Sequence, residues 1–320
     1  MERIFVNDSP MVEIDGLEHR YGKNIALAGI DFQVERGEIF GLLGPNWGGK
    51  TTLFRILSTL IRPYAGTARI LGTDVNQHPE KVRRHFGVVF QSPSLDKELT
   101  ARENLVHQGH LYALNKSELR ARCDTLLEQV GLADRAGDRI KTFSGGMQRR
   151  LEVAKGLLHQ PELLFLDEPT TGLDPGARSD LWQYLNRLCK QDGVTILVTT
   201  HLMEEAERCD RLVILDQGKI VSMGSPTELK QQIGGDVVSL QTADPETLLC
   251  QLRERFDTSA EILNGTVRFE YDKGHELVRD LLTAFGENID SVTIGKPNLE
   301  DVFIRHTGHQ FWEQNLESTR

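Results

Sequence analysis

Residues 38–52 read EIFGLLGPNWGGKTT, an apolar run that leads into a glycine-rich loop and then into the start of a helix. The loop matches the pattern G-x-x-x-x-G-K-[ST], whose backbone N–H groups point inward around phosphate oxygens. A plain glycine-rich turn could also match by chance, but the order of strand, loop and helix favours a phosphate site. The residues expected to bind phosphate are Gly44, Pro45, Asn46, Trp47, Gly48, Gly49, Lys50, Thr51 and Thr52.

Two acids much later in the chain complete the expected site. Residues 162–169, ELLFLDEP, form a hydrophobic strand that ends in Asp167 and Glu168. With Lys50 on the terminal phosphates and the Thr51 hydroxyl on Mg²⁺, Asp167 is expected to hold the same ion, directly or through water. Glu168 is expected to polarise water for in-line attack on the γ-phosphate. Alone, two adjacent acids after a strand are more often solvated loop charges, but the Lys50 loop reverses that preference.

The apolar runs predict an α/β fold with a mainly parallel sheet. They lie at 86–90, 163–166, 194–198 and 212–215, and they are continuous rather than alternating, which is typical of strands buried on both faces. Two earlier strands, 12–17 and one ending at 34, predict an antiparallel part. Residues from about 95 to 160 read almost entirely as helix, so an α-helical subdomain is expected there.

A change of pattern after Ser225-Pro226 predicts a second, small α+β domain. The order from 236 to 307 is β-α-β-β-α-β, with a hairpin at Asn264-Gly265, the strongest short-range hairpin signal. This order is typical of a ferredoxin-like module. We therefore expect an ATP-binding domain at 11–228 and an accessory domain at 232–310.

Composition excludes several classes of partner. The formal net charge of the 320 residues is −10, and residues 231–320 alone carry 8 bases against 16 acids. A chain so poor in positive charge lacks the field that binds nucleic acid or an anionic bilayer. No stretch has the length of a signal peptide core or a membrane span, and the four cysteines are widely spaced, which favours a reducing cytoplasm.

Between the two nucleotide motifs stands FSGGMQ, residues 143–148, and with it the chain resembles the ATP-binding subunit of an ABC transporter. The resemblance implies ATP and Mg²⁺ as cofactors. It also assigns four further residues. Tyr21 stacks on adenine, Gln91 links Mg²⁺ and the γ-phosphate to the permease, Asp174 forms the aspartate loop, and His201 is the switch histidine. Three of them have a plainer interpretation when taken alone: Tyr21 as a surface aromatic, Gln91 as a loop polar group and His201 as a strand-end histidine with its hydrogen bonds satisfied.

The same resemblance implies a dimer. Ser144, Gly145 and Gly146 open a helix with bare N–H donors, which suit a γ-phosphate. Two subunits, here expected to be two copies of this chain, would sandwich two ATP molecules, and each signature would act in trans.

Two further segments narrow the family. Residues 296–308, KPNLEDVFIRHTG, and 99–105, LTARENL, are similar to motifs of ATPases that serve ABC-2 type permeases, including drug-resistance and nodulation exporters. The resemblance implies ATP hydrolysis that powers export through a separate ABC-2 type permease. It places the chain in the cytoplasm, on the inner face of the cell membrane, with membrane contact only through the permease.

Trp47 departs from the family pattern, which has glycine at this position. If the position needs a positive φ, a bulky residue is strained there, unless Gly48 takes the unusual angles instead. An alternative function is therefore a poorly hydrolysing regulatory subunit. The other alternative, a soluble ABC ATPase acting on the ribosome or DNA, usually needs two cassettes or long coiled-coil inserts, and this chain shows neither.

Overall fold

The computed structural model describes residues 9–256 and 258–311. The chain divides into two compact units, Met1–Ile220 and Val221–Arg320, and the division falls inside strand β10 (Lys219–Gly224). Each unit is described by itself. In the described part of the chain, no helix has both the length and the apolar character needed to cross a membrane.

A six-stranded sheet forms the centre of the first unit, and its strand order is β10-β9-β3-β8-β7-β6. The pairs from β9 to β6 are all parallel. Every residue of β3, β7 and β8 is buried, so both faces of the sheet are covered and the predicted α/β class is confirmed. Besides β10, the strands of this sheet are β3 (Ile39–Leu43), β6 (Phe86–Val89), β7 (Leu163–Asp167), β8 (Thr195–Thr200) and β9 (Arg211–Asp216).

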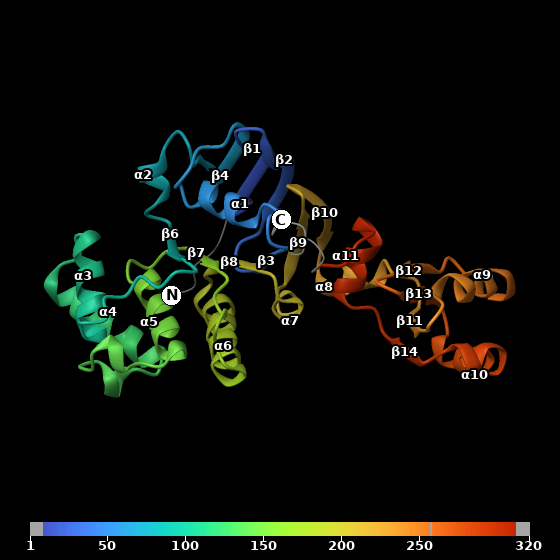
Figure 1. Ribbon diagram of the computed structural model, residues 1–320. Coiled ribbons are helices and arrows are strands. Elements are labelled where there is room, and N and C mark those ends of the chain that lie inside the picture. The colour runs from blue at the N-terminus through green and yellow to red at the C-terminus, as the bar shows by residue number, and fades with distance from the viewer. Residues whose placement is uncertain (1–8, 257, 312–320) are drawn as a thin grey trace. The chain divides into compact units, whose positions relative to one another are not determined.

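An antiparallel sheet, in the order β2-β1-β4-β5, packs with helix α1 (Lys50–Leu57) on one side of this centre. It holds β1 (Val12–Tyr21), β2 (Asn24–Val34), β4 (Ala65–Ile70) and β5 (Thr73–Asp74) (Figure 1). Phe32 stacks on Phe40 with 5.4 Å between ring centroids, which joins the two sheets in one hydrophobic core.

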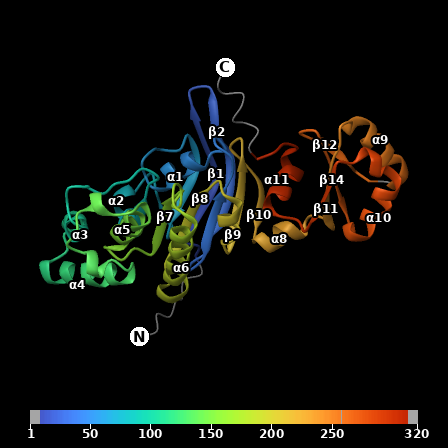
Figure 2. The same cartoon turned by 60° about the horizontal axis from the view of Figure 1, so that its bottom comes forward.

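Helices cover the other face of the parallel sheet. They are α3 (Ala101–Leu111), α4 (Lys116–Gln129), α5 (Gly145–Leu157), α6 (Pro175–Asp192) and α7 (Met203–Ala206), with short 3-10 turns at 133–135 and 140–142. The short helix α2 (Pro79–Val82) lies instead on the side of the antiparallel sheet, where Val82 belongs to the same core as Phe54 of α1. Figure 2 shows α3, α4 and α5 gathered in one group. Side chains such as Leu105, Leu151 and Trp182 belong to one core with Leu164 of the sheet, so this group is anchored on the strands.

The second unit begins with α8 (Pro226–Gln231) and contains a four-stranded sheet in the order β12-β13-β11-β14. Its elements are β11 (Asp236–Gln241), α9 (Pro245–Phe256), β12 (Glu261–Leu263), β13 (Thr266–Tyr271), α10 (Gly274–Phe285), β14 (Ser291–Gly295) and α11 (Leu299–Thr307). Asn264 and Gly265 both have positive φ, as the tight hairpin between β12 and β13 requires. The helices α9 and α10 share a core with the sheet, and Asp301 of α11 pairs with Arg268 of β13.

Candidate functional site

One edge of the parallel sheet gathers most of the predicted site. The loop 44–49 follows β3, Gln91 follows β6, Glu168 follows Asp167 at the end of β7, and His201 follows β8. Because parallel strands end at the same edge, residues more than 150 positions apart in the sequence meet there. This edge is where ligands bind in open α/β sheets.

The glycines of the loop 44–49 are required by close packing. A Cβ at Gly44 would lie 2.3 Å from the carbonyl oxygen of Leu215, and one at Gly49 would lie 2.7 Å from that of Ala26. Gly49 also has φ +107°, which side chains rarely adopt. The backbone N–H of Gly48 donates to Pro45, which closes the turn. The loop is therefore held tightly against Leu215 and Ala26 of its own chain.

Lys50 is the cation of this loop and is buried. Its Nζ donates to the carbonyl oxygens of Gly44, at 2.5 Å, and Pro45, at 2.9 Å. Burial lowers the pKa of Lys50 to about 8, while the charges of Glu168 and Asp167 oppose that shift. The ammonium group is thus positioned for an anion and loses its proton only slightly above neutral pH.

This pKa predicts how ATP binding depends on pH. Lys50 is protonated below about pH 8 and neutral above it, so affinity for ATP should fall as the pH rises. Between pH 7 and pH 9 we expect a loss of about tenfold, the ratio of protonated fractions for such a group. Titration calorimetry across this range measures it. In Lys50→Met, binding should be weak and should lack this step, and an equal step in the variant would show that another group titrates.

Asp167 lies at the end of β7 with its carboxylate tied to the next strand. Its Oδ1 accepts a hydrogen bond of 2.6 Å from Thr199 Oγ1, and burial raises the pKa of the Asp167 carboxyl. The same Thr199 hydroxyl accepts from the backbone N–H of Glu168 at 3.0 Å. Thr199 therefore aligns both acids.

Glu168 is the centre of a hydrogen-bonded group at the sheet edge. Gln91 Nε2 donates to its Oε2 at 3.1 Å, Thr171 Oγ1 donates to the same oxygen at 3.2 Å, and His201 Nδ1 lies 3.0 Å from its Oε1. The hydrogen bond with His201 holds the pKa of the Glu168 carboxyl below its ordinary value. An ionised carboxylate in this place can accept a proton from water.

The signature residues lie on a different helix from the phosphate loop. Ser144 caps α5 and accepts from the backbone N–H of Met147 at 3.3 Å, and both Ser144 and Gly145 are exposed. A Cβ at Gly146 would lie 2.7 Å from the Cβ of Ala177. The backbone N–H of Ala177 donates to Asp174 Oδ1 at 2.9 Å. The signature thus lies against the Asp174 turn. Tyr21, at the end of β1, is also exposed.

Three residues of this region were not predicted from the sequence: Thr171, Thr199 and Arg149. A threonine pair, Thr199-Thr200, at the end of a buried strand was the available signal, since a buried hydroxyl needs a partner. Arg149 donates hydrogen bonds to the backbone of Phe90, Asp167 and Pro169. Nothing in the sequence indicated this role, because a basic residue on a helix is usually exposed.

Trp47 adopts φ +74°, while Gly48 is not among the residues with positive φ, so the alternative that Gly48 takes the unusual angles is wrong. Trp47 is 83% exposed. A bulky residue in the left-handed region costs on the order of 1–3 kcal/mol. The folded loop carries that strain.

We expect Trp47→Gly to relieve the strain, with tighter ATP binding of up to about a hundredfold, a higher free energy of unfolding, or both. Relief appears in affinity to the extent that the unliganded loop relaxes away from this conformation, and otherwise in stability. Calorimetric titration and chemical denaturation on the same preparations separate the two. If neither quantity rises, the loop accommodates Trp47 without cost.

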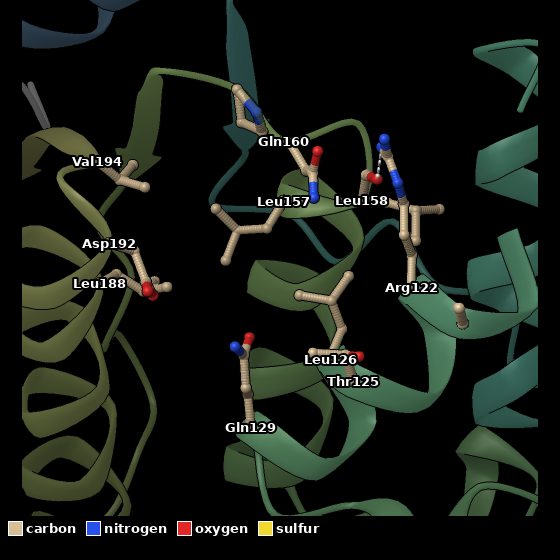
Figure 3. Close-up of a pocket in the computed structure, with 12 residues that line it drawn as sticks. Arg122, Thr125, Leu126, Gln129, Leu157, Leu158, Gln160, Leu188, Asp192 and Val194 are labelled. Carbon is tan, nitrogen blue, oxygen red and sulfur yellow. Dashed lines mark hydrogen bonds between the residues drawn. The ribbon is translucent and has the colours of Figure 1, made fainter. Parts of the chain in front are cut away.

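Figure 3 shows a pocket that lies away from these residues. It has a volume of about 470 Å³ and is lined by the ends of α4, α5 and α6, including Gln129, Leu157 and Asp192. Gln160 and Val194 in its wall precede β7 and β8, so the cavity is at the opposite edge of the sheet from Glu168. It contains none of the predicted site residues.

The sequence matches a known family and is similar to curated proteins over most of its length. Residues 27–171 match the family described as "ABC transporter". The daunorubicin resistance ATP-binding protein DrrA3 of Streptomyces coeruleorubidus is 40% identical over 93% of this chain and 96% of its own length. The Nod factor export ATP-binding protein I of Ralstonia nicotianae is 40% identical over 95% of this chain and 96% of its own.

Solved structures agree in fold. The cbiO1 subunit of the cbiONQ ABC transporter complex from Clostridium perfringens superposes with a TM-score of 0.66 at 25% identity, covering 78% of this chain and 97% of that one. A dimeric post-hydrolysis state of the ATP-binding cassette MJ0796, bound to ADP and Pi, gives a TM-score of 0.60 at 28% identity, covering 67% of this chain and 98% of that one.

Proposed function

This chain belongs to the ABC transporter family of ATP-binding proteins, and we propose that it is the subunit whose ATP hydrolysis powers an exporter. As a member of this family, the chain is an ATPase. The observation that carries the proposal is the convergence of Gln91, Glu168 and His201 at the sheet edge that also holds the Lys50 loop. The relatives named for drug resistance and Nod factor export support export as the direction, and these names do not favour the alternative of a soluble ATPase at the ribosome or on DNA.

Mg²⁺ fits the residues at this edge. Magnesium prefers hard oxygen ligands and in such sites is bound by one or two side chains together with phosphate oxygens. The Asp167 carboxylate, the Thr51 hydroxyl in the first turn of α1 and the Gln91 side chain would hold it. When bound, the ion neutralises charge on the transferred phosphoryl group.

The chain's own groups divide the remaining work. Lys50 and the backbone N–H groups of the loop 44–52 bind and orient the phosphates. Glu168 takes the proton of the attacking water on a carboxylate oxygen, and His201 and Gln91 hold that carboxylate in place. Tyr21 is proposed to stack on adenine, which its exposure permits.

A second copy of the chain is proposed to complete each site. Ser144 and Gly145 present the N-terminus of α5 to solvent, and the neighbouring Gly146 packs against Ala177 in the first turn of α6. A γ-phosphate bound to the loop of one copy would then meet the signature helix and Asp174 turn of the other. The exposed N-terminal dipole of α5 favours that anion.

We further propose that the chain works in the cytoplasm beneath an ABC-2 type permease, with an ATP-binding domain at 11–228, a helical subdomain at about 95–160 and a ferredoxin-like accessory domain at 232–310. The permease would contact the region around Gln91 and the helical subdomain. Phe90 and Leu111 are exposed large apolar side chains there, and Leu111 is 80% exposed at the end of α3. Exposed apolar side chains of this kind are the groups that a permease contact would bury.

Leu111→Glu tests this attachment. We expect the variant to lose at least about tenfold of its recovery with membranes that contain the permease, because a carboxylate cannot be buried in an apolar contact. ATP hydrolysis by the purified variant should be unchanged. Leu282→Glu is the matched control, since Leu282 is 48% exposed but belongs to α10 of the second unit. Equal membrane recovery of the Leu111 and Leu282 variants would contradict permease contact at α3.

A further inference from the structure

Arg149 and Glu152, one turn apart on α5, form a buried ion pair directly behind the site. Their side chains are 8% and 5% exposed, and Arg149 Nη1 donates to Glu152 Oε2 at 2.9 Å. The guanidinium group also donates to three backbone carbonyl oxygens: Nη1 to Phe90 at 2.6 Å, Nε to Pro169 at 2.7 Å and Nη2 to Asp167 at 2.9 Å. Four of its five N–H donors are thus used.

The three carbonyl groups flank the residues that meet at the sheet edge. Asp167 directly precedes Glu168 and Pro169 directly follows it, so Arg149 holds the backbone on both sides of the proton acceptor. Phe90 directly precedes Gln91, whose side chain donates to Glu168 at 3.1 Å. One side chain therefore sets the positions of both partners in that contact.

Glu152 fixes the other end of the Gln91 segment. Its Oε1 accepts a hydrogen bond of 2.7 Å from the backbone N–H of Ser94. Lys155, on the same helix, donates to the Ser94 carbonyl oxygen at 2.9 Å. Residues 91–93 are thereby held between Phe90 and Ser94, and the backbone of each of these two residues is hydrogen-bonded to a side chain of α5.

Stability alone explains this pair poorly. A buried ion pair is often no more stabilising than well-packed apolar residues of similar volume, because both charges must leave water. What an apolar pair cannot supply is a rigid fork of donors that fixes three carbonyl groups at once. The ion pair is therefore better explained by the positions in which it holds these carbonyl groups than by a contribution to stability.

We propose that Arg149 and Glu152 are positioning residues that tie the signature helix to the Gln91 and Glu168 segments, so that the placement of Glu168 depends on the placement of α5. This inference rests on the proposed ATPase function. Neither residue touches substrate. Their effect is to keep the Glu168 carboxylate where the attacking water can be deprotonated, and an error of about 1 Å in such a placement can cost on the order of a hundredfold in rate.

Arg149→Lys is the direct test, because lysine keeps the charge and reaches one carbonyl group but not three. We expect kcat for ATP hydrolysis to fall by about tenfold to a hundredfold, while KM and ATP affinity stay within about twofold of wild type. Arg150→Lys is the matched control. Arg150 is the next residue on the helix and donates to one carbonyl group, that of Val130, at 2.8 Å, away from the catalytic segments.

Two further measurements separate positioning from folding. In a Gln91→Ala background Arg149→Lys should cost less than it does alone, because the contact that it aligns is already gone. Glu152→Gln, which keeps the shape and an oxygen for Ser94, should fold even if Arg149→Lys does not, and should lower kcat by about threefold to tenfold at unchanged KM.

The inference is overturned if Arg149→Lys hydrolyses ATP as fast as Arg150→Lys, or if kcat and KM change together with melting temperature in both Arg149 and Glu152 variants. These failures differ from failure of the proposed function, in which wild type and Arg150→Lys themselves release no phosphate from Mg-ATP.

Discussion

Glu168→Gln is expected to bind ATP as wild type does and to hydrolyse it about 10²–10⁴ times more slowly. The amide keeps the size and the hydrogen-bonding capacity towards Gln91 and Thr171, but it cannot take up the proton of the attacking water. Phosphate release under saturating Mg-ATP measures the rate, and calorimetric titration measures the binding.

Glu204→Gln is the control for Glu168→Gln. Glu204 lies three residues after His201 with its side chain exposed, and its nearest cation is Arg178, at 3.6 Å. Loss of the Glu204 carboxylate should leave the rate of ATP hydrolysis unchanged. A Glu168→Gln chain that hydrolyses ATP within a few fold of wild type would remove Glu168 from the role of proton acceptor.

Gly145→Asp is expected to lower the rate of ATP hydrolysis by about 10²–10³-fold. This is the size of effect seen when an enzyme loses one hydrogen-bond donor to developing negative charge. The nearest atom to a Cβ at Gly145 is Leu173 Cδ2, at 3.7 Å, so the side chain fits its own subunit. An acid in the first turn of a helix stabilises it, so the melting temperature should not fall. A carboxylate there repels the γ-phosphate of ATP bound to the other copy.

Gly137→Asp is the matched control for Gly145→Asp, since Gly137 is exposed and a Cβ there would meet nothing within 4 Å. Gly146 is unsuitable for this test, because a Cβ would lie 2.7 Å from Ala177 Cβ of the same chain. Mixing Gly145→Asp with Lys50→Ala chains leaves one composite site intact in each mixed dimer. Activity should then return if the two sites act independently, and wild-type activity of Gly145→Asp alone would refute a role of the signature in trans.

Local patterns predicted those parts of the fold whose physics is local. The strand, loop and helix around Lys50 and the strand before Asp167 follow from continuous apolar runs that end in glycine or acid, and both stand as expected. The hairpin at Asn264-Gly265 follows from the ease with which these residues take positive φ. In contrast, β4 and β5 are short and partly exposed, which leaves no continuous apolar run to find.

The candidate site was predictable in its members but not in its supports. Glu168 was expected from the acids that end a hydrophobic strand, and Gln91 and His201 from the resemblance to ABC transporter subunits. The sheet brings the three side chains together. Thr199 and Arg149 act through hydrogen bonds to residues 32 and 18 positions away, respectively, and only the tertiary fold shows such partners. At Trp47 the reverse holds: the sequence raised the question of backbone strain, and only the backbone angle answers it.

If a second copy completes each ATP site, two copies of this chain should associate when ATP is bound and separate when it is hydrolysed. The most direct measurement is light scattering of purified Glu168→Gln with and without Mg-ATP, because this variant retains the bound nucleotide. A mass of one chain without nucleotide and of two chains with Mg-ATP is the predicted result. A single-chain mass at concentrations where calorimetry shows ATP bound would contradict the claim.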